Sequence, residues 1–132
     1  ECNAMNKLEQ EAKDWMKERH MSGITGTEYQ EQACSTAIFP KEKATEYLTL
    51  GLTGEAGEIA NKVKKFIRDG APPEEYEAKK IEIAYEIGDV MWYCAVLAAE
   101  MGMDLGHVME NNLRKLADRK ARGALSGSGD NR

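Results

Sequence analysis

Gly54-Glu55-Ala56-Gly57-Glu58 and Glu86-Ile87-Gly88-Asp89 are the two stretches that decide how this chain folds. In each stretch two carboxylates stand three residues apart, which places them on one face of a helix. Each stretch also has a glycine directly before its second acid. Glycine in a helix interior costs about 1 kcal/mol relative to alanine. Its presence indicates a local reason, such as the close approach of another helix.

Both stretches lie in the middle of long segments that lack helix breakers. The residues around the first recur at helical spacing: Leu48, Leu52, Ile59, Val63 and Phe66 or Ile67. Those around the second do the same: Ile81, Tyr85, Gly88, Trp92 and Val96. The sequence therefore predicts helices over about 41–68 and 73–101, with Gly70 ending the first and Pro73 beginning the second. The short connection predicts that they pack antiparallel.

Three further helices are expected: one over about 6–21, one over about 27–37 with Thr27 as its N-cap, and one from Asp104 as N-cap to about 121. No segment reads as a convincing strand. The predicted fold is all-α, an oligomeric bundle of about five helices with a four-helix core. Residues 1–4, before Met5, are interpreted as a vector-derived remnant. Residues 5–122 form one expected domain, and 123–132, which are small and polar, are expected to be a flexible tail or lid.

The four acids interrupt the apolar stripes of their helices instead of lying opposite them. Antiparallel packing would bring Glu55 and Glu58 to the height of Glu86 and Asp89. Four converging carboxylates repel one another unless a divalent cation neutralises them, and ligands that offer only oxygen favour magnesium or manganese over zinc or copper. The alternative for either pair alone is a solvated face of a charged helix. Two pairs at matching heights favour a metal site.

Composition excludes several other classes of protein. The net charge of -5 argues against general nucleic-acid binding, which needs an excess of lysine and arginine. The longest apolar run, near 90–99, is about half of what a membrane span requires. The 3 cysteines are too far apart to indicate a disulfide framework or a zinc knuckle, which favours a reduced, cytoplasmic setting.

The motifs resemble those of the MazG-like nucleotide pyrophosphohydrolases, in particular the small phage and bacterial members. The resemblance rests on Tyr47 to Glu58, Lys64-Lys65, Glu86 to Tyr93 and Asn112 to Arg119, and it extends from about Thr27 to the C-terminus. It implies an all-α, oligomeric enzyme that uses magnesium to cleave nucleoside triphosphates to the monophosphate and pyrophosphate. Many members carry a glutamate where this chain has Gly54.

The acid cluster and the resemblance together assign roles to particular residues. The expected metal ligands are Glu55, Glu58, Glu86 and Asp89, holding Mg²⁺ or Mn²⁺ in its place, with Glu55 also the general base. Lys115 and Arg119 are expected to be catalytic because they would stabilise the pyrophosphate leaving group. The simpler alternative for both is a solvated helix face. Further substrate contacts are expected from Lys65, Asn112 and Trp92, and an aromatic such as Trp92 is more often a core residue.

The expected partners are the nucleoside triphosphate and further copies of the chain, with no nucleic acid and no membrane. One short bundle is too small to complete such a site, so a homodimer or homotetramer is expected, with helices from two subunits closing each pocket. A non-catalytic helical oligomerisation or interaction module is the main alternative. A di-iron bundle ranks low, because neither His20 nor His107 has a glutamate three residues before it.

Overall fold

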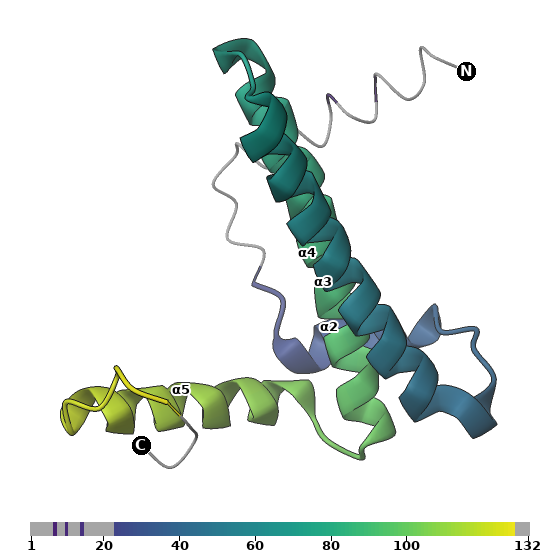
Figure 1. Cartoon of the computed structure of the whole chain (residues 1–132). Coiled ribbons are helices and arrows are strands. Elements are labelled where there is room, and N and C mark those ends of the chain that lie inside the picture. Colours follow the sequence, from purple (N-terminus) through teal and green to yellow (C-terminus); the bar gives the residue numbers. More distant parts are fainter. Residues whose placement is uncertain (1–6, 8–9, 11–13, 15–22, 129–132) are drawn as a thin grey trace.

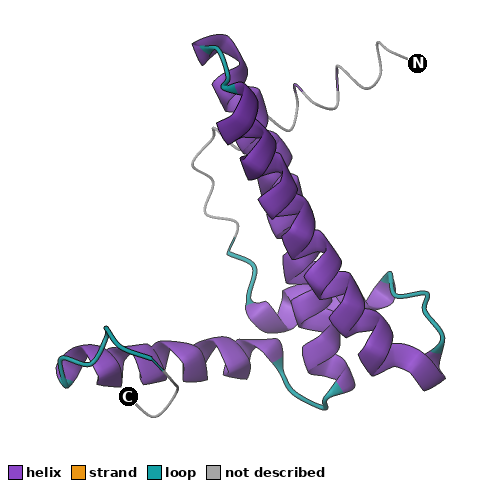
Figure 2. Cartoon of the chain, in the orientation of Figure 1, coloured by secondary structure: helices purple, strands orange, loops and turns teal. Residues whose placement is uncertain are grey.

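The computed structural model describes residues 23–128 together with Lys7, Gln10 and Asp14, and Figure 2 shows only helices and loops in this part of the chain. The elements are α2 (Gly26–Ser35), the 3₁₀ turn η1 (Lys41–Lys43), α3 (Ala44–Asp69), α4 (Pro73–Glu100) and α5 (Leu105–Ala121). The all-α prediction is confirmed. The remnant expected at 1–4 lies outside the described residues, and so does the helix expected at 6–21, apart from Lys7, Gln10 and Asp14. None of the described helices is long and apolar enough to cross a membrane.

Helices α3 and α4 form a long antiparallel hairpin (Figure 1). Helix α3 ends where Gly70 adopts a φ of +68°, a conformation that costs other residues more than glycine. Pro73 then occupies the first turn of α4, where its missing N–H would have had no helical partner. The predicted ends of both helices are therefore confirmed to within a residue, except that α3 is preceded by the turn η1.

The buried core lies at the end of the hairpin where α2 crosses it (Figure 1). Leu48 of α3 is fully buried there, and its buried neighbours are Ala33, Ala95 and Val96. Of the two alternatives in the α3 stripe, Phe66 is half-buried and Ile67 is 77% exposed, so Phe66 is the inward residue.

The buried side chain of Gln30 connects α2 to α4 and α5 through hydrogen bonds. Its Nε2 donates to the carbonyl oxygens of Ala95 at 3.0 Å and Met103 at 2.9 Å, and its Oε1 accepts from the N–H of Leu105 at 3.1 Å. These bonds satisfy backbone groups at the end of α4 and at the start of α5, which would otherwise be costly to bury. The side chain thereby fixes where α5 leaves α4.

The caps of α2 and α5 are also linked. Thr25, not the predicted Thr27, caps α2 through a capping box with Glu28. The hydroxyl of Thr27 instead donates to Asp104 at 2.9 Å. Asp104 caps α5, as predicted, by accepting from the N–H of His107 at 3.0 Å. The hydrogen bond between Thr27 and Asp104 therefore anchors the start of α5 to α2.

Helix α5 projects sideways from the hairpin (Figure 1), so the described part of one chain does not form the predicted four-helix core. The sequence could not show this, because an amphipathic helix has the same pattern whether its partner is in its own chain or in another. Apolar side chains along α5 remain exposed to solvent: Val108 40%, Met109 50%, Leu113 66% and Leu116 40%.

Candidate metal centre

Three carboxylates meet near the middle of the hairpin. Glu55 of α3 and Glu86 and Asp89 of α4 each offer an oxygen within 4.8 Å of the others. Glu55 and Glu86 are half-buried, and Asp89 is exposed. The three-residue spacing on α4 and the antiparallel partner helix thus bring together three of the four expected ligands.

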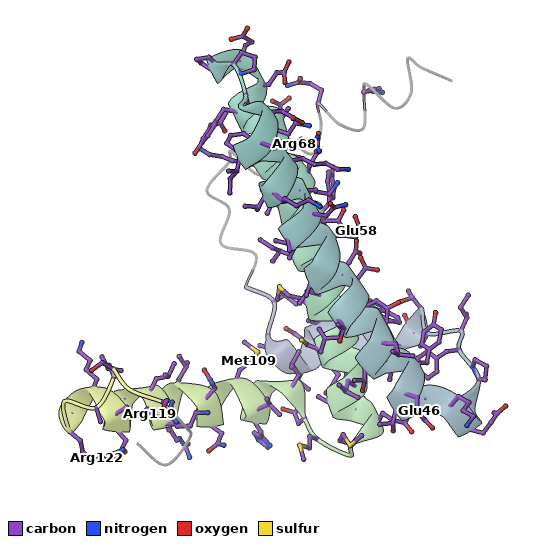
Figure 3. The ribbon with its side chains drawn as sticks, in the orientation of Figure 1. Glu46, Glu58, Arg68, Met109, Arg119 and Arg122 are labelled. Carbon is purple, nitrogen blue, oxygen red and sulfur yellow. The ribbon has the colours of Figure 1, made fainter. Side chains whose placement is uncertain are left out.

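Glu58 does not join this group of three. It is exposed, and Figure 3 shows it projecting from the side of the hairpin. Its charge nevertheless contributes to a raised pKa of Glu55, so the two carboxylates lie within electrostatic reach.

Burial and the repulsion between neighbouring carboxylates both act on Glu55. The pKa of Glu55 is raised, first by burial, then by the negative charges of Asp89 and Glu86 and a hydrogen bond with Glu86. An ionised carboxylate beside two others is stabilised when a cation binds among them. The donors are all carboxylate oxygens, which are hard ligands suited to Mg²⁺ or Mn²⁺, so these residues fit such an ion.

Lys62 of α3 forms an ion pair with one of the three acids. Its Nζ lies 3.3 Å from Oε1 of Glu86. The sequence did not single out this contact, although the signal was present: Lys62 lies four residues after Glu58 and seven after Glu55, on the same side of α3. The pair reduces the charge that the carboxylate group presents.

A polar hollow of about 350 Å³ continues from Lys62 toward the tip of the hairpin. The expected substrate-binding residue Lys65 lines it, as does Lys79 from α4. Its remaining walls are Phe66, Asp69, Gly70, Glu75 and Glu82. The site therefore has an anionic part and, beside it, a hollow lined by both ammonium groups and carboxylates.

Tyr93 of α4 lies within electrostatic reach of Glu55 and Asp89. Burial raises its pKa first, followed by a hydrogen bond with Tyr47 and then by the charges of Tyr47, Glu55 and Asp89. A Cβ at Gly51 would lie 2.1 Å from this ring, so glycine lets Tyr93 lie against the backbone of α3. A glycine four residues before Glu55 was the available sequence signal, but it does not identify the aromatic partner.

Trp92 has a core position in this chain. Its indole N–H donates to the hydroxyl of Thr36 at 2.8 Å, and its ring meets that of Tyr93 edge-on, with centroids 4.9 Å apart. The ring packs against the buried cluster around Leu48. Trp92 thus contributes to the core, the more common position of an aromatic at helical spacing.

The expected phosphate-binding residues of α5 do not lie beside the acids of the same chain. Asn112, Lys115 and Arg119 follow one side of α5, which runs away from the hairpin, and Figure 3 shows Arg119 near its far end, well separated from Glu58. Arg119 is only 4% exposed, which is incompatible with the simple solvated face considered for it. Within the described part of one chain, the acids and these α5 residues therefore lie apart.

The glycines within the two motifs do not mediate helix approach inside the chain. A Cβ at Gly54, Gly57 or Gly88 would meet nothing within 4 Å among the described residues. The expected close approach occurs instead at Gly51, against Tyr93. Spacing alone could not distinguish these positions, because all four glycines lie in helix interiors.

Comparison with known proteins gives a consistent result. The family profile described as the MazG nucleotide pyrophosphohydrolase domain matches residues 43–123, which run from η1 to just past α5. The Gene 37 protein of Mycobacterium phage L5 is 47% identical over 112 residues, covering 79% of this chain and 96% of that protein. No solved structure gave a significant match.

Proposed function

The chain belongs to the MazG nucleotide pyrophosphohydrolase family, and from this we propose that it hydrolyses a nucleoside triphosphate to the monophosphate and pyrophosphate. The observation that carries the proposal is the group formed by Glu55, Glu86 and Asp89 in the middle of the matched segment. Three carboxylates this close together repel one another, and they suit a site that holds a divalent cation.

The same residues would hold the cation, Mg²⁺ or Mn²⁺ in its place, with Glu58 as a further ligand. When bound, such an ion neutralises phosphate oxygens and makes a coordinated water more acidic. Glu55 is the proposed general base, because its half-buried carboxylate lies among the acids that would hold the ion. Water attacks the α-phosphorus, Glu55 takes the proton, the bond to the bridging oxygen breaks, and pyrophosphate leaves.

The substrate's phosphates also need cationic partners. Lys65 lines the hollow next to the acids and is proposed to contact the substrate's phosphates directly. Asn112 and the proposed catalytic residues Lys115 and Arg119 lie on the projecting α5, and we propose that they reach the acids of a second copy of the chain. Trp92, which is half-buried, is also proposed as a substrate contact.

Exposed apolar surface supports a homodimer or homotetramer. Besides the residues of α5, the hairpin exposes Ile67 (77%), Ile87 (47%) and Met91 (50%). Large apolar side chains left exposed on two elements are the kind of surface that a protein–protein interface covers. Light scattering is expected to return the mass of a dimer or tetramer, and a monomer with full catalytic activity would contradict this part of the proposal.

Hydrolysis in water enriched in oxygen-18 tests the reaction. The protein is incubated with magnesium and each of the common ribo- and deoxyribonucleoside triphosphates, and the products are analysed by mass spectrometry. Label is expected in the nucleoside monophosphate and not in pyrophosphate. Label in pyrophosphate would refute attack at the α-phosphorus, and release of orthophosphate with a nucleoside diphosphate would refute the reaction class.

A further inference from the structure

The ion pair between Lys62 and Glu86 is less exposed than a neighbouring pair on the same hairpin. The two side chains are 29% and 18% exposed, compared with 40% and 38% for Lys79 and Glu82. Partly buried charges are screened less by salt and solvent, so this contact is stronger than an ordinary surface ion pair. In the metal-free protein, Lys62 is therefore the ion-pair partner of Glu86.

A divalent cation and Lys62 compete for the same carboxylate. Glu86 is one of the three acids whose oxygens lie within 4.8 Å of one another, and the Lys62 ammonium lies 3.3 Å from that carboxylate. A cation held by the three acids would also repel the ammonium. Binding of the cation must therefore weaken or break the Lys62–Glu86 pair.

The hollow beside the acids offers the displaced ammonium another position. Lys62 lines this space together with Lys65 and Lys79. Two of the carboxylates that line it already have partners: Glu82 contacts Lys79 at 3.1 Å, and Asp69 accepts from Arg68 at 2.6 and 2.7 Å. The third carboxylate of the lining, Glu75, is matched in number by the ammonium group of Lys65. A released Lys62 therefore leaves the hollow with one positive charge in excess, and this favours an anion there.

We propose that Lys62 exchanges partners, from Glu86 in the metal-free protein to a phosphate oxygen in the adjoining hollow once the acids hold a divalent cation. The inference rests on the proposed function, since it assigns the hollow to the terminal phosphates of the substrate and to the pyrophosphate released. The exchange couples the two ligands: the cation frees the lysine that binds the phosphates, and the phosphates stabilise the lysine's new position.

Lys62→Met separates the two roles of the lysine, because methionine keeps an apolar stem and removes the charge. Calorimetric titration of the metal-free protein with magnesium chloride is expected to show binding about two- to fivefold tighter than in the wild type, since the competing ammonium is gone. Titration of the magnesium-saturated protein with magnesium pyrophosphate is expected to show binding roughly tenfold weaker, since a charge-assisted hydrogen bond is lost.

Lys64→Met is the matched control, because Lys64 is an exposed lysine of α3 that does not line the hollow. It should leave both affinities unchanged, and Lys62→Arg should restore most of the pyrophosphate affinity. Circular dichroism establishes that each variant folds. Lys62→Met affinities that both equal the wild-type values, or that both fall, would overturn the inference: the first result describes a passive surface pair, the second a residue that only supports the site.

The inference and the proposed function fail in different ways. If the wild type releases pyrophosphate from nucleotides but Lys62→Met changes neither affinity, the partner exchange is wrong and the function stands. If no nucleotide is hydrolysed but the two affinities still change in opposite directions, the exchange is right and the hollow serves another phosphate ligand. A wild type that binds neither magnesium nor pyrophosphate refutes both.

Discussion

Gly51 and Gly54 stand one turn apart on α3, and alanine should act in opposite directions at the two positions. A Cβ at Gly54 would meet nothing within 4 Å among the described residues, whereas a Cβ at Gly51 would lie 2.1 Å from Cε1 of Tyr93. Where there is room, alanine in place of a helix-interior glycine stabilises by about 1 kcal/mol. Gly54→Ala is therefore expected to raise the free energy of unfolding by about 1 kcal/mol.

At Gly51 the same backbone gain is opposed by overpacking, which costs about 1–3 kcal/mol. The upper end of this range applies, because the Tyr93 ring is held between Tyr47 and Trp92, at centroid distances of 6.5 and 4.9 Å, and moving it disturbs both contacts. Gly51→Ala is thus expected to lose about 2 kcal/mol net, combining these two terms. The two variants then differ by about 3 kcal/mol, or roughly 9–15 °C in melting temperature for a chain of this size.

Thermal unfolding followed by circular dichroism, without magnesium and at one protein concentration, measures both variants under comparable conditions. Gly57→Ala serves as a second open position and should resemble Gly54→Ala. A Gly51→Ala protein as stable as Gly54→Ala would refute the packing of Tyr93 against α3. A loss at Gly54 alone would instead indicate that another chain covers that face.

The other expected outcomes concern charge, buried hydrogen bonds and assembly. Folding raises the pKa of Glu55, so its ionised form destabilises the metal-free fold above that raised pKa, and the loss disappears as the pH falls through it to below the unfolded value. Glu55→Gln should therefore raise the melting temperature of the metal-free protein at neutral pH, with a gap to the wild type that closes on acidification; a gap that widens in acid contradicts the assignment. Gln30→Ala breaks three hydrogen bonds, one buried and two partly buried, so urea unfolding should show a loss of at least about 2 kcal/mol. A loss below about 0.5 kcal/mol, the size of an ordinary surface substitution, would show that Gln30 is not a structural tie. Leu113→Glu places a charge on the exposed stripe of α5 and should reduce the mass seen by light scattering, whereas an unchanged mass would show that this stripe lies outside the interface.

Local rules predicted the hairpin well. The periodicity around Leu48 and Ile81, the positive φ of Gly70 and the first-turn Pro73 all act within a few residues, so the sequence contains the physical cause of each. The meeting of Glu55 with Glu86 and Asp89 follows from the same register, because two antiparallel helices joined by a short turn can align in few ways.

Features that depend on partners distant in sequence could not be predicted. Nothing local to Gly51 identifies Tyr93 as the ring that packs on it, and nothing local to Gln30 shows that it ties α4 to α5. The direction of α5 likewise depends on contacts at its start, such as the bond between Thr27 and Asp104. For the same reason, the separation of Arg119 from the acids was not visible in the spacing of charged residues.

The most direct test of the metal centre as the catalytic site is a pyrophosphate-release screen over the common nucleoside and deoxynucleoside triphosphates, comparing the wild type with Asp89→Asn. Asp89→Asn is nearly isosteric and removes one charge from the carboxylate group. Magnesium-dependent release by the wild type, lowered at least about a hundredfold in the variant, is the result that the account predicts. Equal release by both folded proteins, or release that does not need a divalent cation, would contradict it.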